Sequence, residues 1–371
     1  MSALPEIPTV DLADLRSGEP GRLARAASAI LEGFGLYGLV YVRNHGVGDM
    51  GPLYERFLAF TLRPDGEKER YNRGDLWFQR GWSPPNTERA VVAGGQPDFK
   101  ECWFAAPTPM PREMQLQFPE VYADNVWPED DDVFAALYMQ RGAELHQAGL
   151  ALLQGADLAL SLPEGALPSL CHDGPHIFRL LRYLPLTAEQ ASGRRVLWGE
   201  EHTDFNLLTL LPGGRFHDPG GHVAAPPDAT SGLYLRTRPD QDHPDGRMVK
   251  GAAPPGCLVA QVGQELEILT GGTFLATPHV ITAPEEPGWS RLSAAHFVHV
   301  HGHRMLFPLP PFRSDATVRS YSPPVLAGTY GIKTLVDIGL APESALQKLG
   351  YRHYERLART REFVLGRTRV P

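Results

Sequence analysis

The chain has 371 residues, and its 35 Lys and Arg against 43 Asp and Glu give a formal net charge of −8. This length can bury a full hydrophobic core, which excludes a mini-protein held together by disulfides. The acidic balance without a basic run argues against a general nucleic-acid binder, because phosphate contacts need clustered Lys and Arg.

The N-terminal half is predicted to be mainly helical, with short strands between the helices. Residues 7–12 are predicted to form a strand, and residues 20–34 repeat apolar side chains at helical spacing. A β-branched run at 39–42 predicts a second strand, and a helix is expected at 50–62. The longest helical pattern covers residues 131–155.

Residues 33–38 spell GxGxxG, the pattern of a dinucleotide-binding turn. That function needs a strand before the glycines and a helix after them, so that helix N–H groups meet the pyrophosphate. Here a helix precedes and a strand follows. We therefore interpret the glycines as a helix end and a turn into the strand.

Beyond residue 176, short apolar runs alternate with clusters of Gly, Pro and Asp, which favours a jelly roll or barrel. The expected strands are 178–184, 206–211, 232–236, 258–262 and 292–300. Residues 212–231 look like a long excursion between two strands, either a wall of the substrate site or a solvated loop. A C-terminal helix is expected over residues 342–362.

We expect one domain, mostly β with helices, built on a double-stranded β-helix (jelly-roll) core. Its parts are a mainly helical region over residues 1–175, the catalytic core over 176–310, and an extension with a helix over 311–371. The sequence shows no signal peptide and no apolar run long enough to cross a bilayer. Three widely spaced cysteines predict reduced thiols, so we expect a cytoplasmic protein with no membrane partner.

A metal site is suggested by His202 and Asp204, which we expect at the start of a strand on one face. His279, after a Gly-rich turn, is the candidate third ligand. Two His and one carboxylate on one face of an octahedron are the ligand set of non-haem Fe(II) oxygenases. The spacing alone leaves an alternative, in which these three residues are ordinary surface or core residues that are hydrogen-bonded within the protein and bind no metal.

Arg291 and Ser293 lie two residues apart on a predicted strand, so their side chains share one face. A guanidinium there can hold a carboxylate through two hydrogen bonds, and the hydroxyl can add another. An iron site together with a nearby carboxylate-binding pair is a more specific indication of function than either feature alone.

A rival metal site is offered by the histidine-rich strand end with His296, His299, His301 and His303. It lacks a carboxylate ligand. Because His299 shares the parity of Arg291 and Ser293, it is also a candidate substrate contact.

Taken in order, HTDFNLLTLL, GLYLR, ILTGGTFLATPHVI and RLS resemble the catalytic half of iron(II)- and 2-oxoglutarate-dependent oxygenases of the isopenicillin N synthase-like family. IPTVDL and GFGLYGLVYVRNHGV are similar to the N-terminal region of that family. GGQPDF, DGPHIFRLLRYLP and TGGTFLATPH are locally similar to bacterial ethylene-forming enzyme.

The resemblance implies that His202, Asp204 and His279 hold Fe(II), and that Arg291, with Ser293, binds the distal carboxylate of the cosubstrate 2-oxoglutarate. Arg179 matches a second arginine near that cosubstrate, and Tyr183 matches a position facing the pocket. The implied reaction consumes dioxygen, oxidises and most often hydroxylates a small molecule, and releases succinate and carbon dioxide.

Two stretches depart from the family. Val91, Val92 and Ala93 replace the polar residues that bind arginine in ethylene-forming enzyme, which argues against ethylene formation. The usual Asn-Ile-Gly-Asp run reads Gln-Val-Gly-Gln over residues 261–264. We expect this second change to alter a turn and to leave the chemistry intact.

Three alternatives stay open on sequence grounds. One is an Fe(II) oxidase that does not use 2-oxoglutarate and in which Arg291 and Ser293 hold the carboxylate of the substrate itself. The second is a zinc hydrolase with the same three ligands, and the third is a non-catalytic ligand-binding jelly roll. The primary substrate and the oligomeric state are not determined by the sequence.

Overall fold

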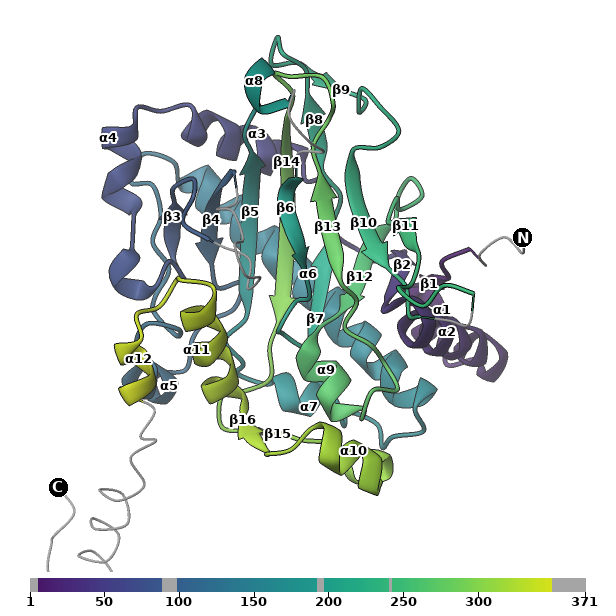
Figure 1. Cartoon of the computed structure of the whole chain (residues 1–371). Helices are drawn as coiled ribbons and strands as arrows, with labels where there is room; N and C mark the ends of the chain where they lie inside the picture. The colour runs from purple at the N-terminus through teal and green to yellow at the C-terminus, as the bar shows by residue number, and fades with distance from the viewer. Residues whose placement is uncertain (1–5, 89–98, 192–196, 240–241, 349–371) are drawn as a thin grey trace, which may run out of the picture.

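Two β-sheets face one another in the computed structural model, which describes residues 6–88, 99–191, 197–239 and 242–348 (Figure 1). The larger sheet has the strand order β1 (Thr9–Asp11), β2 (Leu39–Arg43), β12 (Leu258–Val262), β7 (Leu208–Leu211), β14 (Ser290–Val298), β5 (Ile177–Tyr183), β4 (Lys100–Ala105) and β3 (Gly81–Ser83). The smaller sheet has the order β11 (Met248–Lys250), β10 (Gly232–Arg236), β13 (His279–Thr282) and β6 (Leu197–His202). This arrangement confirms the predicted jelly-roll core.

The inner faces of the two sheets share an apolar cluster that contains Leu181, Trp198, Leu233 and Ile281. The ring of Tyr183 on β5 stacks on that of Trp198 on β6, with 5.3 Å between their centroids. The cavity that holds the site lies in this interior, because Arg179 on β5 and Arg291 on β14 point to the same inner face as the apolar side chains of the cluster.

Helices cover the outer face of the larger sheet, behind the strands in Figure 1. The helices before residue 175 are α1 (Leu12–Leu15), α2 (Pro20–Glu32), α3 (Gly51–Thr61), α4 (Asp65–Lys68), α5 (Arg112–Gln117), α6 (Asp132–Ala159) and α7 (Pro168–Cys171). The long helix α6 begins where the Asp131 side chain accepts a hydrogen bond from the N–H of Phe134. It packs on β7 and β14, where Gly149 leaves room for Leu210 and Val298.

The GxGxxG segment is not a nucleotide turn. It forms the π-helical turn η1 (Gly33–Tyr37), and Gly38 then takes a left-handed conformation (φ 64°) before β2. A Cβ on Gly38 would lie 2.2 Å from the carbonyl oxygen of Leu275, so only glycine fits there. The prediction of a helix end leading into a strand is confirmed.

Two sequence predictions need correction, and one helix was not predicted. His202 ends strand β6, whereas Asp204 lies in the connection before β7, so the two do not share one strand. The 212–231 segment contains two short strands, β8 (Arg215–His217) and β9 (Val223–Ala224), and β8 pairs with β14. The sequence did not predict helix α11 (Ala327–Asp337), which lines a cavity together with His202 and Asp204.

The remaining elements after β5 are short. They are α8 (Ala188–Ala191), α9 (Gln264–Leu269), β15 (Met305–Leu306), α10 (Asp315–Ser320), β16 (Val325–Leu326) and α12 (Ser344–Lys348). The expected helix at 342–362 is seen as α12, and its part beyond residue 348 lies outside the described residues. No helix among the described residues is long and apolar enough to cross a membrane.

Candidate active site

The three predicted metal ligands meet at one end of the smaller sheet. His202 is the last residue of β6, and the antiparallel register places it directly opposite His279, the first residue of β13. Asp204 follows two residues after His202, and its carbonyl oxygen accepts a hydrogen bond from the N–H of Gln264 at 2.8 Å. This bond holds the connection after β6 against the start of α9.

The ligand atoms of these residues lie within 4.8 Å of one another. Oδ1 of Asp204 is 3.7 Å from Nε2 of His202 and 3.9 Å from Nε2 of His279. The side chains of Asp204 and His279 are 10% and 8% exposed, whereas that of His202 is 37% exposed. The cluster is therefore buried on one side and open to a cavity on the side of His202.

Hydrogen bonds behind the cluster orient both imidazoles. Nδ1 of His202 lies 2.7 Å from the carbonyl oxygen of Glu200, and Nδ1 of His279 lies 3.3 Å from that of Thr277. A carbonyl oxygen accepts only from Nδ1–H, which leaves the lone pair of each Nε2 free and directed at the cluster. Thr209 donates its hydroxyl to Oδ2 of Asp204 at 2.7 Å, so Oδ1 is the oxygen available for a metal.

This donor set fits Fe(II). Two neutral imidazole nitrogens and one carboxylate oxygen form the facial set typical of non-haem Fe(II) centres. Burial and the imidazole of His202 lower the pKa of His279 to about 4, which keeps it neutral. Burial alone would raise the pKa of Asp204, but His279, His202 and the Thr209 hydroxyl lower it overall. Among the described residues, no other group of His, Cys, Asp or Glu meets the same ligand spacing.

A cavity of about 640 Å³ extends inward from the cluster between the two sheets; we call it the inner chamber. Arg291 and Ser293 on β14 line it together with Tyr183 and Arg179 on β5. The register pairs Arg291 with Tyr183 and Ala295 with Arg179, so these side chains share the inner face of the larger sheet. The structure thus brings the predicted cosubstrate residues to one side of the metal cluster.

The guanidinium of Arg291 forms no salt bridge with any described residue and instead lies 5.7 Å from the ring centroids of both Tyr183 and Phe216. A cation held between two rings without a carboxylate partner is suited to an anionic ligand. The inner chamber therefore offers the guanidinium of Arg291 as a partner for an anionic group.

Arg179 has a second set of contacts that the sequence did not predict. Its Nη1 donates to both carboxylate oxygens of Glu88 at 3.2 Å, and Glu88 also pairs with Lys100 at 2.8 Å. Burial would raise the pKa of Glu88, but Lys100 and Arg179 lower it to about 2. No sequence pattern indicated Glu88, because its partners come from two different strands, Lys100 on β4 and the distant Arg179 on β5.

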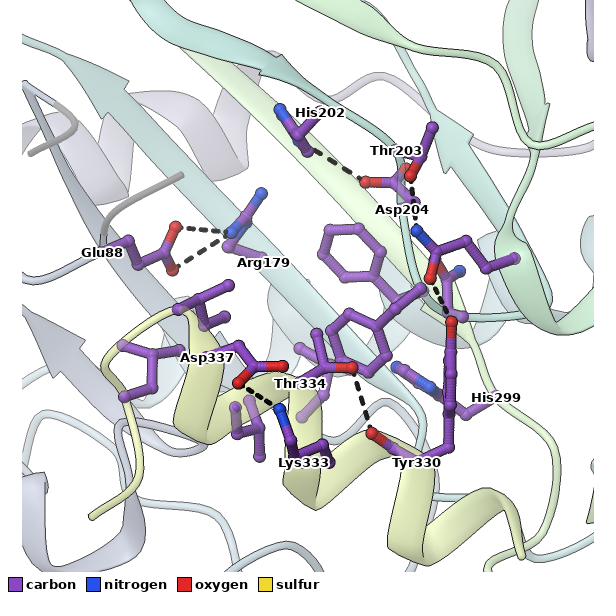
Figure 2. A pocket seen from close by; sticks show the side chains of 18 of the residues that line it. Glu88, Arg179, His202, Thr203, Asp204, His299, Tyr330, Lys333, Thr334 and Asp337 are labelled. Carbon is purple, nitrogen blue, oxygen red and sulfur yellow. Dashed lines mark hydrogen bonds and ion pairs between the residues drawn. The ribbon is translucent and has the colours of Figure 1, made fainter. Parts of the chain in front are cut away.

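A second cavity, also of about 640 Å³, opens on the exposed side of the cluster; we call it the outer chamber (Figure 2). Helix α11 supplies one wall, with Tyr330, Lys333 and Thr334 facing the cavity. Tyr330 donates its hydroxyl to Oε1 of Gln264, and Nε2 of Gln264 donates to Oγ1 of Thr203 at 2.5 Å. These two bonds connect α11 to the residue between His202 and Asp204. The metal cluster lies where the two chambers meet. Five residues line both chambers: Lys100, Arg179, His202, Asp204 and Phe297.

The rival histidine cluster is divided by strand alternation. His299 lines the outer chamber, as its parity predicted, and lies 3.9 Å from Glu265. His296 points to the opposite face, where its Nε2 lies 3.3 Å from Nδ1 of His146 on α6. His301 and His303 contact each other at the surface end, with ring centroids 5.4 Å apart. These residues do not converge on one metal position.

Known proteins share this sequence pattern and fold. The family described as non-haem dioxygenase in morphine synthesis N-terminal matches residues 7–130. The 2-oxoglutarate-dependent dioxygenase imqE of Aspergillus flavus is 26% identical over 352 residues, which cover 84% of this chain and 89% of that protein. Leucoanthocyanidin dioxygenase of Malus domestica is 22% identical and covers 74% of this chain and 68% of its own length.

Solved structures have the same architecture. A full-length Neurospora crassa protein in complex with alpha-KG superimposes with a TM-score of 0.71 at 19% identity, covering 89% of this chain and 96% of that one. A 2OG-Fe(II) oxygenase family protein from Caulobacter crescentus gives a TM-score of 0.70 at 24% identity, covering 90% and 99%.

Proposed function

We propose that the chain, a non-haem Fe(II)- and 2-oxoglutarate-dependent dioxygenase by its sequence relatives and its metal cluster, hydroxylates a small molecule bound in the outer chamber. The observation that carries the proposal is the position of the His202–Asp204–His279 cluster between two chambers, one of which contains Arg291 without a carboxylate partner among the described residues. Two ligands that must meet at one metal can each have a chamber of their own.

In this proposal His202, Asp204 and His279 hold the iron, and Arg291 with Ser293 binds the distal carboxylate of 2-oxoglutarate. Tyr183 packs against the guanidinium of Arg291 and keeps it in the inner chamber. Arg179, which pairs with Glu88, lines both chambers beside the cluster. Bound Fe(II), together with 2-oxoglutarate and dioxygen, would supply the oxidising power for hydroxylation, with succinate and carbon dioxide as the products of the cosubstrate.

The protein contributes positioning and exclusion of water. Thr209 occupies one carboxylate oxygen of Asp204, so that the other points to the metal. Backbone carbonyls fix the tautomers of His202 and His279. Helix α11 covers the outer chamber, and its link through Gln264 to Thr203 orients this wall relative to the ligands.

Three finer points are part of the proposal. The chain is expected to work as one domain with the divisions 1–175, 176–310 and 311–371, since strands β1 to β4 join the sheet that carries β14. The isopenicillin N synthase-like label rests on the order of the motifs in the sequence. A cytoplasmic location is supported by the three cysteines, all of them free thiols.

The test is an anaerobic titration of the apoprotein with Fe(II) and then with 2-oxoglutarate, followed by visible absorption. We expect a metal-to-ligand charge-transfer band that needs both additions and that weakens strongly in Arg291→Ala. Tight Fe(II) binding without this band would contradict the cosubstrate assignment. That result would favour the 2-oxoglutarate-independent oxidase.

A further inference from the structure

The two chambers differ in how their charges are paired. The inner chamber has in Arg291 a cation without a carboxylate partner among the described residues, which suits its anionic ligand. The outer chamber also contains charged side chains, but each described one has a partner within the protein. This difference bears on the substrate.

The charged side chains of the outer chamber form ion pairs with other residues of the protein. Glu88 lies between Lys100 and Arg179, at 2.8 Å and 3.2 Å. Glu201 pairs with Arg236 at 2.7 Å, and Lys333 pairs with Asp337 one helical turn away. Glu200 also has a partner, and Asp204 belongs to the metal cluster. A charged group bound against the buried Glu88, Lys100 and Arg179 would have to separate their pairing or remain uncompensated, and either change is unfavourable in a buried site.

Apart from the polar side chains of Gln79, Thr203, Asn206, Gln264 and Thr334, the uncharged part of the described wall is apolar or aromatic. Phe104, Ile177 and Phe297 come from β4, β5 and β14, while Phe205, Leu335 and Ile338 close the opposite side. The guanidinium of Arg179 stacks over Phe297 at 4.9 Å and over Phe104 at 5.6 Å, and the Phe205 ring lies 5.3 Å from that of His299. Such flat surfaces favour ring systems, which gain from stacking as well as from burial.

We propose that the outer chamber selects an uncharged, mainly apolar substrate with a flat ring system. A volume of about 640 Å³ is in the range of cavities that hold drug-sized molecules. This inference rests on the proposed function only in that the bound molecule is the one oxidised. The selection itself follows from the paired charges and the aromatic wall.

The experiment compares three probes with one ring system and different charge: 2-naphthaleneacetamide, 2-naphthaleneacetate and 2-(2-naphthyl)ethylammonium. Dissociation constants are measured by calorimetry on the full chain loaded anaerobically with Fe(II) and 2-oxoglutarate. We expect the neutral amide to bind at least 10-fold more tightly than either ion. Equal or tighter binding of an ion, or binding of none of the three, would overturn the inference.

Calorimetry is repeated without metal and cosubstrate, so that the chamber is tested even if the charge-transfer band is absent. Preference for the amide with no band would contradict the proposed function and support this inference. Tighter binding of an ion than of the amide, together with a normal charge-transfer band, would support the proposed function and contradict this inference.

Two variants introduce an unpaired cation by different routes. Ile338→Lys adds a charge to the wall at a half-buried position, and Glu88→Gln removes the anion between Lys100 and Arg179. In each, we expect the affinity for the acetate to rise at least 10-fold relative to the amide. Leu326→Lys, at an exposed apolar position that does not line the outer chamber, is the matched control and should leave the ratio unchanged. An unchanged ratio in both chamber variants would overturn the inference.

Discussion

The side-chain amide of Gln261 lies 2.5 Å from Nδ1 of His279, and the buried oxygen of that amide has no hydrogen-bond partner among the described residues. Turning the amide by 180° places its oxygen against Nδ1–H, because the two ends have nearly the same shape. That arrangement satisfies the oxygen and leaves the Nε2 lone pair of His279 directed at Asp204. Gln261 is thus a group that sets the tautomer of a metal ligand from behind.

Replacing Gln261 with Leu should weaken Fe(II) binding by about 10- to 100-fold, the usual effect of losing such a partner. The isosteric Gln261→Glu keeps an acceptor for Nδ1–H and should bind Fe(II) at least as tightly as the parent chain. Anaerobic metal titration followed by calorimetry measures both. Equal affinities of the Leu variant and the parent would show that the carbonyl of Thr277 is sufficient to hold His279.

Arg291→Ala should weaken 2-oxoglutarate binding by about 10- to 100-fold, because it removes charged hydrogen bonds worth about 1.5–3 kcal/mol. Arg291→Lys keeps the charge but cannot donate two parallel hydrogen bonds to one carboxylate. Its affinity for 2-oxoglutarate should lie between those of the parent chain and Arg291→Ala. The control is Arg215→Ala, since Arg215 lines the same chamber but already pairs with Asp49. If the Arg215 and Arg291 variants lose the same affinity, the anchor has been assigned to the wrong arginine.

Tyr330→Phe removes the hydroxyl that connects α11 to Gln264. A lost hydrogen bond of about 1 kcal/mol should speed hydrogen exchange of the α11 amides about 5-fold and leave 2-oxoglutarate affinity unchanged. Hydrogen-exchange mass spectrometry measures the helix directly. Tyr321→Phe removes a comparable bond to Glu267 on α9 and should leave α11 unaffected. Unchanged exchange in Tyr330→Phe would mean that apolar packing alone seats the helix.

The buried histidines predict loss of stability in acid. Burial lowers the pKa of His146 to about 4 and puts those of His176 and His296 well below 6.5. Below pH 6.5 the unfolded chain binds protons that the folded chain does not. The free energy of unfolding should therefore fall as pH drops from 6.5 toward 4, by up to about 1.4 kcal/mol per pH unit for each histidine.

Glu265 acts in the opposite direction, because burial raises its pKa above the ordinary value and the folded chain then holds an extra proton. His146→Gln isolates one histidine and should reduce the pH slope measured by denaturant unfolding. His172→Gln, at an exposed position, should not change the slope. A slope that is the same in both variants would show that His146 does not contribute to it.

The alternation of side chains along a strand allowed part of this site to be predicted from the sequence. Side chains alternate along a strand, so the parity of Arg291, Ser293 and His299 predicted that they share a face, and all three line the chambers. Local sequence also excluded a nucleotide-binding function for the GxGxxG motif, because a helix precedes it and a strand follows it. The order of motifs likewise predicted the jelly roll, because each motif combines a strand pattern with its turn.

Tertiary structure decided the rest. His202 meets His279 because β6 and β13 pair in one particular register, and sequence spacing does not fix the register of two strands far apart in the chain. The pairing of Glu88 with Arg179, the contact of Gln261 with His279 and the position of α11 over the outer chamber have the same origin. Backbone periodicity determines which way a side chain points, whereas the packing of distant segments determines what it meets.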